Sequence, residues 1–358
     1  MEISSPPSAS GVLPRVLIVD DSAIARGVLA RMAEEGGGFA VAGAVADIGA
    51  ALAFLAAERV DLILLDLEMP GVDGLTGLPD LLAVGRGAKV LVVSSSCEQG
   101  ADATIRALAL GAADTLVKPG AGGAVSGFAT ALRERMTRLT ERPRAAAEAP
   151  HMPGRAPGRF DMVAIGASTG GIHALSRLLR AVPAGFEPPI LITQHLPAAF
   201  SASFATQMAV FGNRPCQVAT DRMPVRPGRI VVAPGDAHIV AVPGKGGHCM
   251  IRLSRDPVAN GNMPSVDPML ASLADIHGPR LLAVVLSGMG RDGLEGAGAV
   301  RRAGGTVVVQ DAASSVIWGM PGAVVDAGHA DAVMPPEAIG ALIAAQAQLS
   351  LGSAARIG

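Results

Sequence analysis

The feature that most constrains the fold is a regular alternation of short apolar runs with stretches of helical periodicity. Five such pairs lie between Arg15 and Thr140, and their apolar runs are VLIV, FAVAGAV, LILL, VLVV and TLV. Uninterrupted apolar strands need cover on both faces, as in a parallel sheet between two layers of helices. A second alternation begins at Phe160. The sequence therefore predicts two α/β domains, a (βα)5 domain followed by a doubly wound, mostly parallel one.

Chain length agrees with two domains, because 358 residues exceed the size of one ordinary domain. We expect a first domain over residues 14–137, a linker over 138–159 and a second domain over 160–348. The linker mixes Pro, Ala, Gly and Arg without apolar periodicity, which is typical of an interdomain connection. In the middle of the second domain, RIVVAPG, HIVAVPG and HCMIRLS predict short β segments and hairpins.

Composition and charge exclude several classes of protein. Hydrophobic residues make up 50% of the chain and charged residues 17%, which excludes a disordered chain. The formal net charge of −2 provides no basic field for nucleic acid or anionic lipid. Three cysteines without CxxC spacing predict neither disulfides nor a cysteine-based zinc site. Since we find no signal-like segment and no apolar run of about 18 residues, we expect a cytoplasmic protein without membrane insertion.

Polar side chains follow the strands predicted in the first domain. Asp20 and Asp21 follow the first strand, and Asp66 follows the third. Ser94 ends the fourth strand, and Lys118 follows the fifth. The carboxyl ends of parallel strands form one edge of the sheet, where ligands bind. Three carboxylates at one edge repel each other unless a cation neutralises them, and an oxygen site with few protein ligands suits Mg²⁺.

This set of groups predicts an aspartyl-phosphate site. Asp66 would be the nucleophile that receives the phosphoryl group, and Asp21 and Asp66 would hold Mg²⁺, with Asp20 acting through water. Ser94 and Lys118 would bind the phosphoryl oxygens. A tandem Asp is also a common helix cap and a Lys-Pro pair a common turn. All five groups at one edge, however, favour phosphorylation.

The motifs VDD, LDLEMPGVDG, VVSS and VKP resemble those of bacterial response-regulator receiver domains over roughly residues 14–135. The resemblance implies that a chemotaxis histidine kinase donates the phosphoryl group and that phosphorylation controls another domain. The sequence departs from the receiver pattern at Thr115, where such domains usually carry an aromatic switch residue. A rotating aromatic ring is therefore not expected to transmit the signal.

A serine stands on a predicted strand-to-helix turn at the start of the second domain. Ser168 lies in a G-x-S-x-G frame within IGASTGG, and such a turn exposes the hydroxyl and offers N–H groups to an oxyanion. The frame alone also fits a glycine-rich turn with a serine N-cap. A serine nucleophile needs a base and an orienting acid. Two other strand ends supply them, since ILITQH ends at His195 and the turn after LLAVVLSG contains Asp292.

We therefore expect Ser168, His195 and Asp292 to form a catalytic triad. His195 would deprotonate Ser168, and Asp292 would fix the imidazole tautomer. The N–H group of Met289, in a Gly-Met-Gly turn, is the candidate oxyanion donor. Of the other six histidines, only His238 is expected near the site.

The motifs IGASTGG, QHL, VAPGDAH, PSVD, SGMGRDG and WGMPGAV resemble, in this order, those of the protein-glutamate methylesterases of bacterial chemotaxis, the CheB family. The resemblance implies hydrolysis of glutamyl 5-O-methyl esters on methyl-accepting chemotaxis receptors, release of methanol, and often deamidation of receptor glutamines. It also places Thr169 beside Met289 in the site lining. Ester hydrolysis by a triad needs no cofactor, so Mg²⁺ is expected to serve receiver phosphorylation only. One departure is NGNM before Pro264, where the family more often has His or Arg.

Together these resemblances predict a methylesterase regulated by phosphorylation, with the unphosphorylated receiver covering the edge at Ser168. One alternative is a catalytically degenerate adaptor that only binds receptors. Another is a dinucleotide-binding oxidoreductase, but GASTGG lacks the G-x-G-x-x-G spacing and the chain has no tyrosine. A DNA-binding output module would need far fewer residues than the second half and a basic recognition helix.

Overall fold

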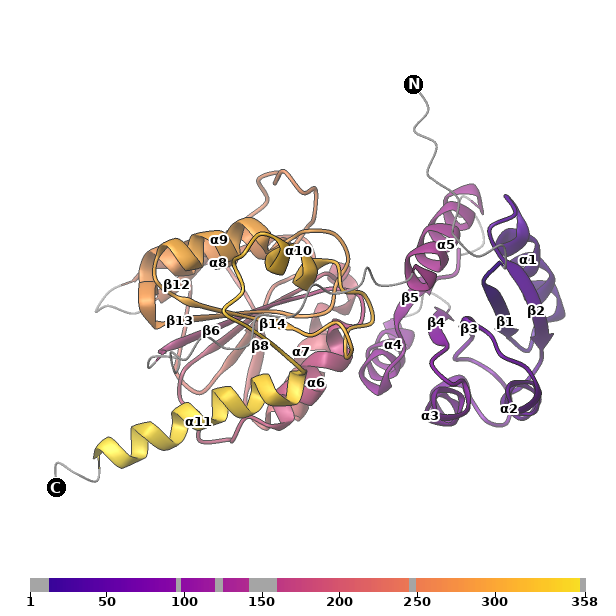
Figure 1. Cartoon of the computed structure of the whole chain (residues 1–358), viewed down its shortest axis with the longest axis horizontal. Coiled ribbons are helices and arrows are strands. Elements are labelled where there is room, and N and C mark those ends of the chain that lie inside the picture. The colour runs from indigo at the N-terminus through magenta and orange to yellow at the C-terminus, as the bar shows by residue number, and fades with distance from the viewer. Residues whose placement is uncertain (1–12, 95–97, 120–124, 142–159, 245–248, 355–358) are drawn as a thin grey trace. The chain divides into compact units, whose positions relative to one another are not determined.

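The computed structural model describes residues 13–94, 98–119, 125–141, 160–244 and 249–354. These residues form two compact units, of which the first contains a five-stranded sheet and the second a seven-stranded and a three-stranded sheet (Figure 1). Most of the predicted linker, residues 142–159, lies outside the described residues. The domain boundaries therefore stay a prediction.

The first five strands and five helices of the chain have the predicted alternation, although residues 97–114, which include the fourth helix, group with the second compact unit. The sheet of these five strands has the order β2-β1-β3-β4-β5, and β1 pairs in parallel with β2 and β3, as does β3 with β4. The (βα)5 prediction is confirmed. The elements are β1 (Arg15–Val19), α1 (Ala23–Glu34), β2 (Ala40–Val45), α2 (Ile48–Ala57), β3 (Leu62–Leu65), α3 (Gly74–Val84), β4 (Lys89–Ser94), α4 (Glu98–Leu110), β5 (Asp114–Val117) and α5 (Val125–Thr140).

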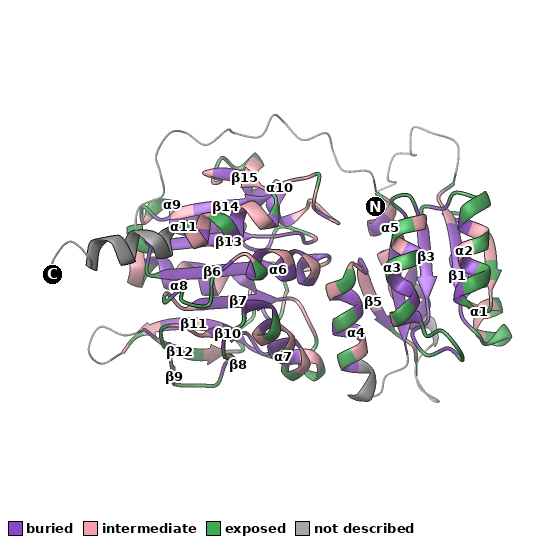
Figure 2. Cartoon of the chain, turned by 90° about the horizontal axis from the view of Figure 1, so that it is seen from below, coloured by how far each residue is buried: buried purple, intermediate pink, exposed green. Residues whose placement is uncertain are grey.

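Local sequence explains why these elements form. All four residues of β3 are buried, as an apolar strand between two layers of helices requires (Figure 2). Three helices begin with side-chain caps, since Ser22, Asp47 and Asp73 each accept a hydrogen bond from a backbone N–H of the first turn. Each cap directly precedes its helix, and after β1 and β2 the chain turns from the strand end into the helix within a few residues.

The large sheet of the second unit has the order β15-β14-β13-β6-β7-β10-β8, and all of its pairings are parallel. The prediction of a doubly wound, mostly parallel sheet is confirmed. Its strands are β6 (Met162–Ala167), β7 (Ile190–Gln194), β8 (Cys216–Val218), β10 (Ile230–Val232), β13 (Leu281–Val285), β14 (Thr306–Gln310) and β15 (Ala332–Met334).

A smaller antiparallel sheet lies within the same unit. It has the order β11-β12-β9 and comprises β9 (Met223–Pro224), β11 (His238–Pro243) and β12 (Cys249–Ser254). The predicted hairpin is therefore present between β11 and β12, whereas the IVV run of β10 joins the parallel sheet. The helical segments of this unit are α6 (Gly171–Arg180), η1 (Ala198–Phe200), α7 (Ser201–Gly212), α8 (Val266–His277), η3 (Gly278–Arg280), α9 (Leu294–Arg302), α10 (Met320–Asp326) and α11 (Pro336–Ala354).

Helix α8 is one of the elements that the sequence analysis did not assign. Pro264 and Pro268 flank its start and are typical of turns. Proline is nevertheless tolerated in the first turn of a helix, because the N–H groups there have no partner within the helix. Val266 at the first position of α8 packs against Gly166 of β6, where any side chain would collide with it. The start of α8 is therefore held against the central strand.

Strand β6 is the point at which the strand order of the large sheet reverses. The chain leaves β6 for β7 on one side and later returns to β13 on the other. Open parallel sheets bind ligands at the carboxyl ends of the strands that flank such a switch point. The topology therefore singles out the residues that follow β6, β7 and β13.

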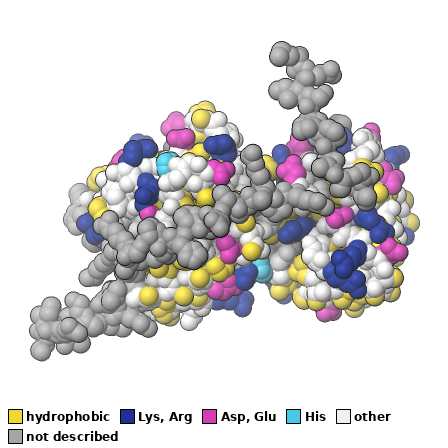
Figure 3. Space-filling view, in the orientation of Figure 1, with side chains coloured by type: hydrophobic (Ala, Val, Ile, Leu, Met, Phe, Trp, Pro, Cys, Tyr) yellow, Lys and Arg dark blue, Asp and Glu magenta, His cyan; other side chains and the backbone are white. Residues whose placement is uncertain are grey.

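Two further observations concern the charge of the visible surface and the length of the described helices. On the face shown in Figure 3, acidic and basic side chains are interspersed on both units. No helix in the described part of the chain is long and apolar enough to cross a membrane.

Candidate active site and phosphorylation site

Three adjacent strands bring the predicted triad together. Ser168 follows β6, His195 follows β7 and Asp292 lies in the turn after β13. Nδ1 of His195 lies 3.1 Å from Oγ of Ser168, and Nε2 lies 2.7 Å from Oδ2 of Asp292. The three side chains thus form a continuous hydrogen-bonded relay. Their catalytic roles stay predictions.

The turn that presents Ser168 is fixed by its own backbone. The Ser168 N–H donates to the carbonyl of Ser287, and the Ser168 carbonyl accepts from Gly171 N–H and from the side chain of Gln194. Gly170 has a φ of +77°, which lets the chain reverse into α6. Since its own N–H is engaged, Ser168 can contribute its hydroxyl to a reaction but not this N–H to an oxyanion.

His195 is oriented from both sides. Its backbone N–H donates to the carbonyl of Ala167, and its side chain is 17% exposed. An ionised Asp292 can only accept, so Nε2 of His195 carries the proton and Nδ1 is left to accept from the Ser168 hydroxyl. This tautomer makes Nδ1 the candidate base.

Asp292 is fully buried, and its carboxylate is surrounded by donors. Burial alone would raise the pKa of Asp292, but the hydrogen bond and charge of His195, together with further donors, lower this pKa to about 2. The carboxylate is therefore ionised at neutral pH. Besides His195, its donors are the Ser265 hydroxyl, the Asn260 amide and the backbone N–H groups of Val266, Asp267 and Gly293.

Most of these donors were not predicted from the sequence. Val266 and Asp267 form the start of α8, and a helix N-terminus stabilises a negative charge. Ser265 occupies the N-cap position without capping the helix, because its hydroxyl donates to Asp292 instead. The predicted neighbour His238 is buried and accepts the N–H of Ser265 at Nδ1. The Ser-Val-Asp sequence after Pro264 is the one signal that could have indicated this helix start.

The loop expected to supply the oxyanion donor is anchored next to Ser168. The Gly288 N–H donates to Ile317, and its carbonyl accepts from Gly319 and Met320. A Cβ atom on Gly288 would lie 2.8 Å from Cβ of Ser168, so only glycine fits there. The N–H of Met289 donates to no acceptor among the described residues, and Met289 and Thr169 are both half-buried. Their roles in the site lining stay predictions.

In the first unit, the structure brings Asp20, Asp21 and Asp66 together. One carboxylate oxygen from each lies within 4.8 Å of the others. Nζ of Lys118 lies 2.8 Å from Oδ2 of Asp20 and 2.6 Å from Oδ2 of Asp66. Ser94 is buried, and its carbonyl accepts the N–H of Lys118. All five predicted side chains therefore come from one edge of the sheet.

Electrostatics in this cluster are set by burial and by the lysine. Burial raises the pKa of Asp66, although Lys118 partly offsets this. Burial alone would lower the pKa of Lys118, but hydrogen bonds to Asp20 and Asp66 raise it above its usual range. Two buried carboxylates and the exposed carboxylate of Asp21 form an oxygen-rich donor set that fits Mg²⁺ and leaves room for water.

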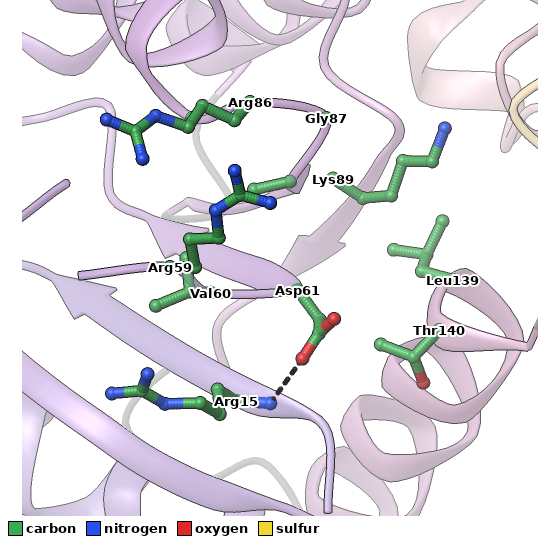
Figure 4. A pocket seen from close by; sticks show the side chains of 11 residues that line it. Arg15, Arg59, Val60, Asp61, Arg86, Gly87, Lys89, Leu139 and Thr140 are labelled. Atoms are coloured by element: carbon green, nitrogen blue, oxygen red, sulfur yellow. Dashed lines mark hydrogen bonds between the residues drawn. The ribbon is translucent and has the colours of Figure 1, made fainter. Parts of the chain in front are cut away.

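A cavity of about 420 Å³ lies at the opposite edge of the first sheet, where the strands begin (Figure 4). Its lining includes the basic residues Arg15, Arg59, Arg86 and Lys89. Helices α2, α3 and α5 end at this edge, and cations are favoured near helix C-termini. The basic lining therefore has a structural explanation.

Comparison with known proteins gives two family matches. Residues 163–343 match the CheB methylesterase family, and residues 16–125 match the response regulator receiver domain family. A protein-glutamate methylesterase/protein-glutamine glutaminase of Caulobacter vibrioides is 42% identical over 93% of this chain and 99% of the relative. One from Pseudomonas aeruginosa is 40% identical over 93% of this chain and 96% of the relative. The crystal structure of the Thermotoga maritima CheB methylesterase catalytic domain is similar with a TM-score of 0.50 and 35% identity, covering 52% of this chain and 98% of that one.

Proposed function

Because the chain belongs to the CheB methylesterase family and contains a receiver domain, we propose that it hydrolyses glutamyl 5-O-methyl esters on chemoreceptors in bacterial chemotaxis. The observation that carries this proposal is the relay from Ser168 through His195 to the buried carboxylate of Asp292. The same groups would deamidate receptor glutamines, with ammonia leaving in place of methanol. Such a protein acts on the cytoplasmic part of its receptors.

The first half of the reaction transfers the glutamyl group to the enzyme. Oγ of Ser168 attacks the ester carbonyl while Nδ1 of His195 takes the hydroxyl proton. The charge on the resulting imidazolium is stabilised by Asp292, and the N–H of Met289 stabilises the oxyanion. His195 then gives its proton to the departing methoxide, so that methanol leaves and a glutamyl ester of Ser168 remains.

The second half regenerates the enzyme. His195 takes a proton from water, the hydroxide attacks the ester of Ser168, and the proton returns to Oγ as the glutamic acid side chain leaves and loses its remaining proton to solvent water. Every proton in this cycle moves between the substrate, water, Ser168 and His195. The proposed reaction therefore requires no cofactor.

We further propose that phosphorylation of Asp66 by a histidine kinase raises the esterase activity. Asp21 and Asp66 would hold Mg²⁺ directly, with Asp20 acting through water, and the ion would neutralise charge on the incoming phosphoryl group. Lys118 already contacts Asp66 and would bind a phosphoryl oxygen together with Ser94. Phosphorylation adds negative charge at this edge, which would release an inhibition exerted by the receiver domain.

The test is methanol release from a methylated receptor fragment, with and without a small phosphodonor and Mg²⁺. Release that disappears in Ser168→Ala and rises with phosphodonor is the expected result. Release from Asp66→Asn that still rises with phosphodonor would refute the regulation while leaving the esterase intact. A folded wild-type protein that releases no methanol would instead favour the receptor-binding adaptor.

A further inference from the structure

A second carboxylate lies next to the triad acid. Asp267, in the first turn of α8, donates its backbone N–H to Oδ1 of Asp292, 3.2 Å away. One carboxylate oxygen of Asp267 accepts from the N–H of Gly296 in α9, and the other faces Asn260. The proposed reaction uses Asp292 but assigns no role to Asp267 or Asn260.

The side-chain amide of Asn260 lies between the two carboxylates. Its Nδ2 is 2.9 Å from Oδ1 of Asp292 and 3.1 Å from Oδ2 of Asp267, so these oxygens are no more than about 6 Å apart. The same nitrogen is 3.1 Å from Oγ of Ser265. A single NH2 group is therefore the shared donor of both acids.

The loop that contains Asn260 fixes the direction of this amide. Its Oδ1 accepts the backbone N–H of Asn262, 3.0 Å away, which turns Nδ2 toward the carboxylates. Gly261, between the two asparagines, has a φ of +71° and allows this tight turn. These residues belong to the NGNM sequence that departs from the family pattern, so the structure gives that sequence a position beside the triad acid.

Asp292 is buried, Asp267 is half-buried and Asn260 is exposed. Two carboxylates at this distance, one of them shielded from water, repel each other unless a donor lies between them. Burial raises the pKa of Asp267 to about 6, and the charge of Asp292 contributes to this rise. The other titratable groups at the cluster are His195, bonded to Asp292, and His238, bonded to the N–H of Ser265. Without the shared donor, the charge of Asp267 would tend to move Asp292 away from His195.

We propose that Asn260 is a positioning residue of the methylesterase, whose amide allows Asp267 and Asp292 to lie side by side and so keeps Asp292 on His195. This inference rests on the hydrolysis proposed above. Asp292 retains its other donors when the Asn260 amide is removed, so the fold of the site survives. The loss is therefore expected in catalysis, and only where Asp267 is charged.

The test compares Asn260→Ala with the matched control Asn262→Ala in the full chain, over a range of pH. At about pH 8, Asn260→Ala is expected to lower kcat for methanol release about tenfold with little change in KM. At about pH 5.5, where Asp267 takes up a proton, the ratio of wild-type to variant activity is expected to fall to about two. Asn262→Ala keeps its backbone N–H and is expected to stay within about twofold of wild type.

The double variant Asn260→Ala/Asp267→Asn separates repulsion from a merely structural role. Removing the charge of Asp267 should restore kcat at about pH 8 to within about threefold of the Asp267→Asn single variant. Losses that multiply in the double variant, or a pH-independent loss in Asn260→Ala, would overturn the proposal.

If the wild type released no methanol, the proposed esterase activity would be refuted. A measurement without substrate tests the role of Asn260 independently of that outcome. The carboxyl carbon of Asp267, followed by NMR in selectively labelled protein, should titrate at a higher pH in Asn260→Ala than in wild type. An unchanged titration midpoint in a folded variant would refute the role of Asn260 between the two acids.

Discussion

Replacement of Asp292 by asparagine is the substitution whose outcome the structure specifies most fully. Oδ1 of Asp292 faces four donors, whereas Oδ2 faces only two, Nε2 of His195 and the N–H of Val266. An asparagine NH2 group is itself a donor, so at the position of Oδ2 it would face two other donors, whereas at the position of Oδ1 it would face four. It would therefore face His195, whose Nε2 must then accept a hydrogen bond.

This exchange reverses the tautomer of His195. With Nε2 as the acceptor, Nδ1 carries the proton and directs it at Oγ of Ser168, so the imidazole cannot take the hydroxyl proton. We expect kcat to fall about 10⁴-fold, the scale of loss for a wrong tautomer in a catalytic triad. The buried N–H of Val266 also loses its acceptor, which costs about 1–3 kcal/mol of unfolding free energy.

The assay is methanol release from a methylated receptor fragment, with folding checked by circular dichroism. Asp267→Asn is the matched control, because it makes the same chemical exchange one hydrogen bond further from His195. This control is expected to lose less than about tenfold in kcat. A folded Asp292→Asn protein that keeps more than about 1% of wild-type kcat would refute the tautomer argument.

Three further predictions concern stability, the phosphorylation site and the turn at Gly288 next to Ser168. Because the pKa of Asp267 is raised from 3.8 to about 6, its ionisation opposes folding above about pH 6. The unfolding free energy of wild type relative to Asp267→Asn should therefore change little from about pH 7.5 to 6.5 and rise as pH falls from about 6 to 4. Urea titrations followed by the single tryptophan, Trp318 in the second unit, measure it. Asp21→Asn should raise the Mg²⁺ concentration needed for half-maximal phosphorylation about tenfold, and it should not lower stability because Asp21 is exposed. Phosphorylation rates at several Mg²⁺ concentrations check this, and an unchanged Mg²⁺ requirement would contradict it. Gly288→Ala places a methyl group against Ser168 and should lower kcat about 100-fold; near-normal methanol release would show that the turn can relax.

Strand ends were the most informative positions in the sequence. Uninterrupted apolar runs such as LILL and VLVV predicted the strands. Because the carboxyl ends of parallel strands lie at one edge of a sheet, the same prediction placed Asp66 near Lys118 and Ser168 near His195, as the structure has them. The reasoning succeeded because each side chain immediately follows a strand whose neighbours are set by the chain order. A residue at such a position needs only local information to be located.

The partners of Asp292 could not be located in this way. Asn260 and Ser265 lie 32 and 27 residues before it, on a loop and a helix start rather than at a strand end. Helix α8 was missed because its two prolines are typical of turns, although proline fits the first turn of a helix. Hydrogen bonds between residues so far apart in the sequence depend on how α8 packs against β6, and that packing cannot be predicted from the periodicity of apolar residues.

The two acidic sites explain why position alone does not decide what a carboxylate does. Asp66 and Asp292 both follow a strand of a parallel sheet and are both buried. Asp66 has few donors, so burial prevails and raises its pKa. A raised pKa suits a carboxylate that phosphorylation would convert into an acyl phosphate. Asp292 is surrounded by donors that overcome burial and lower its pKa to about 2, which suits a group that stays charged throughout a catalytic cycle. The strand end fixes where each acid lies, and the donors that tertiary packing brings to it determine whether its pKa is raised or lowered.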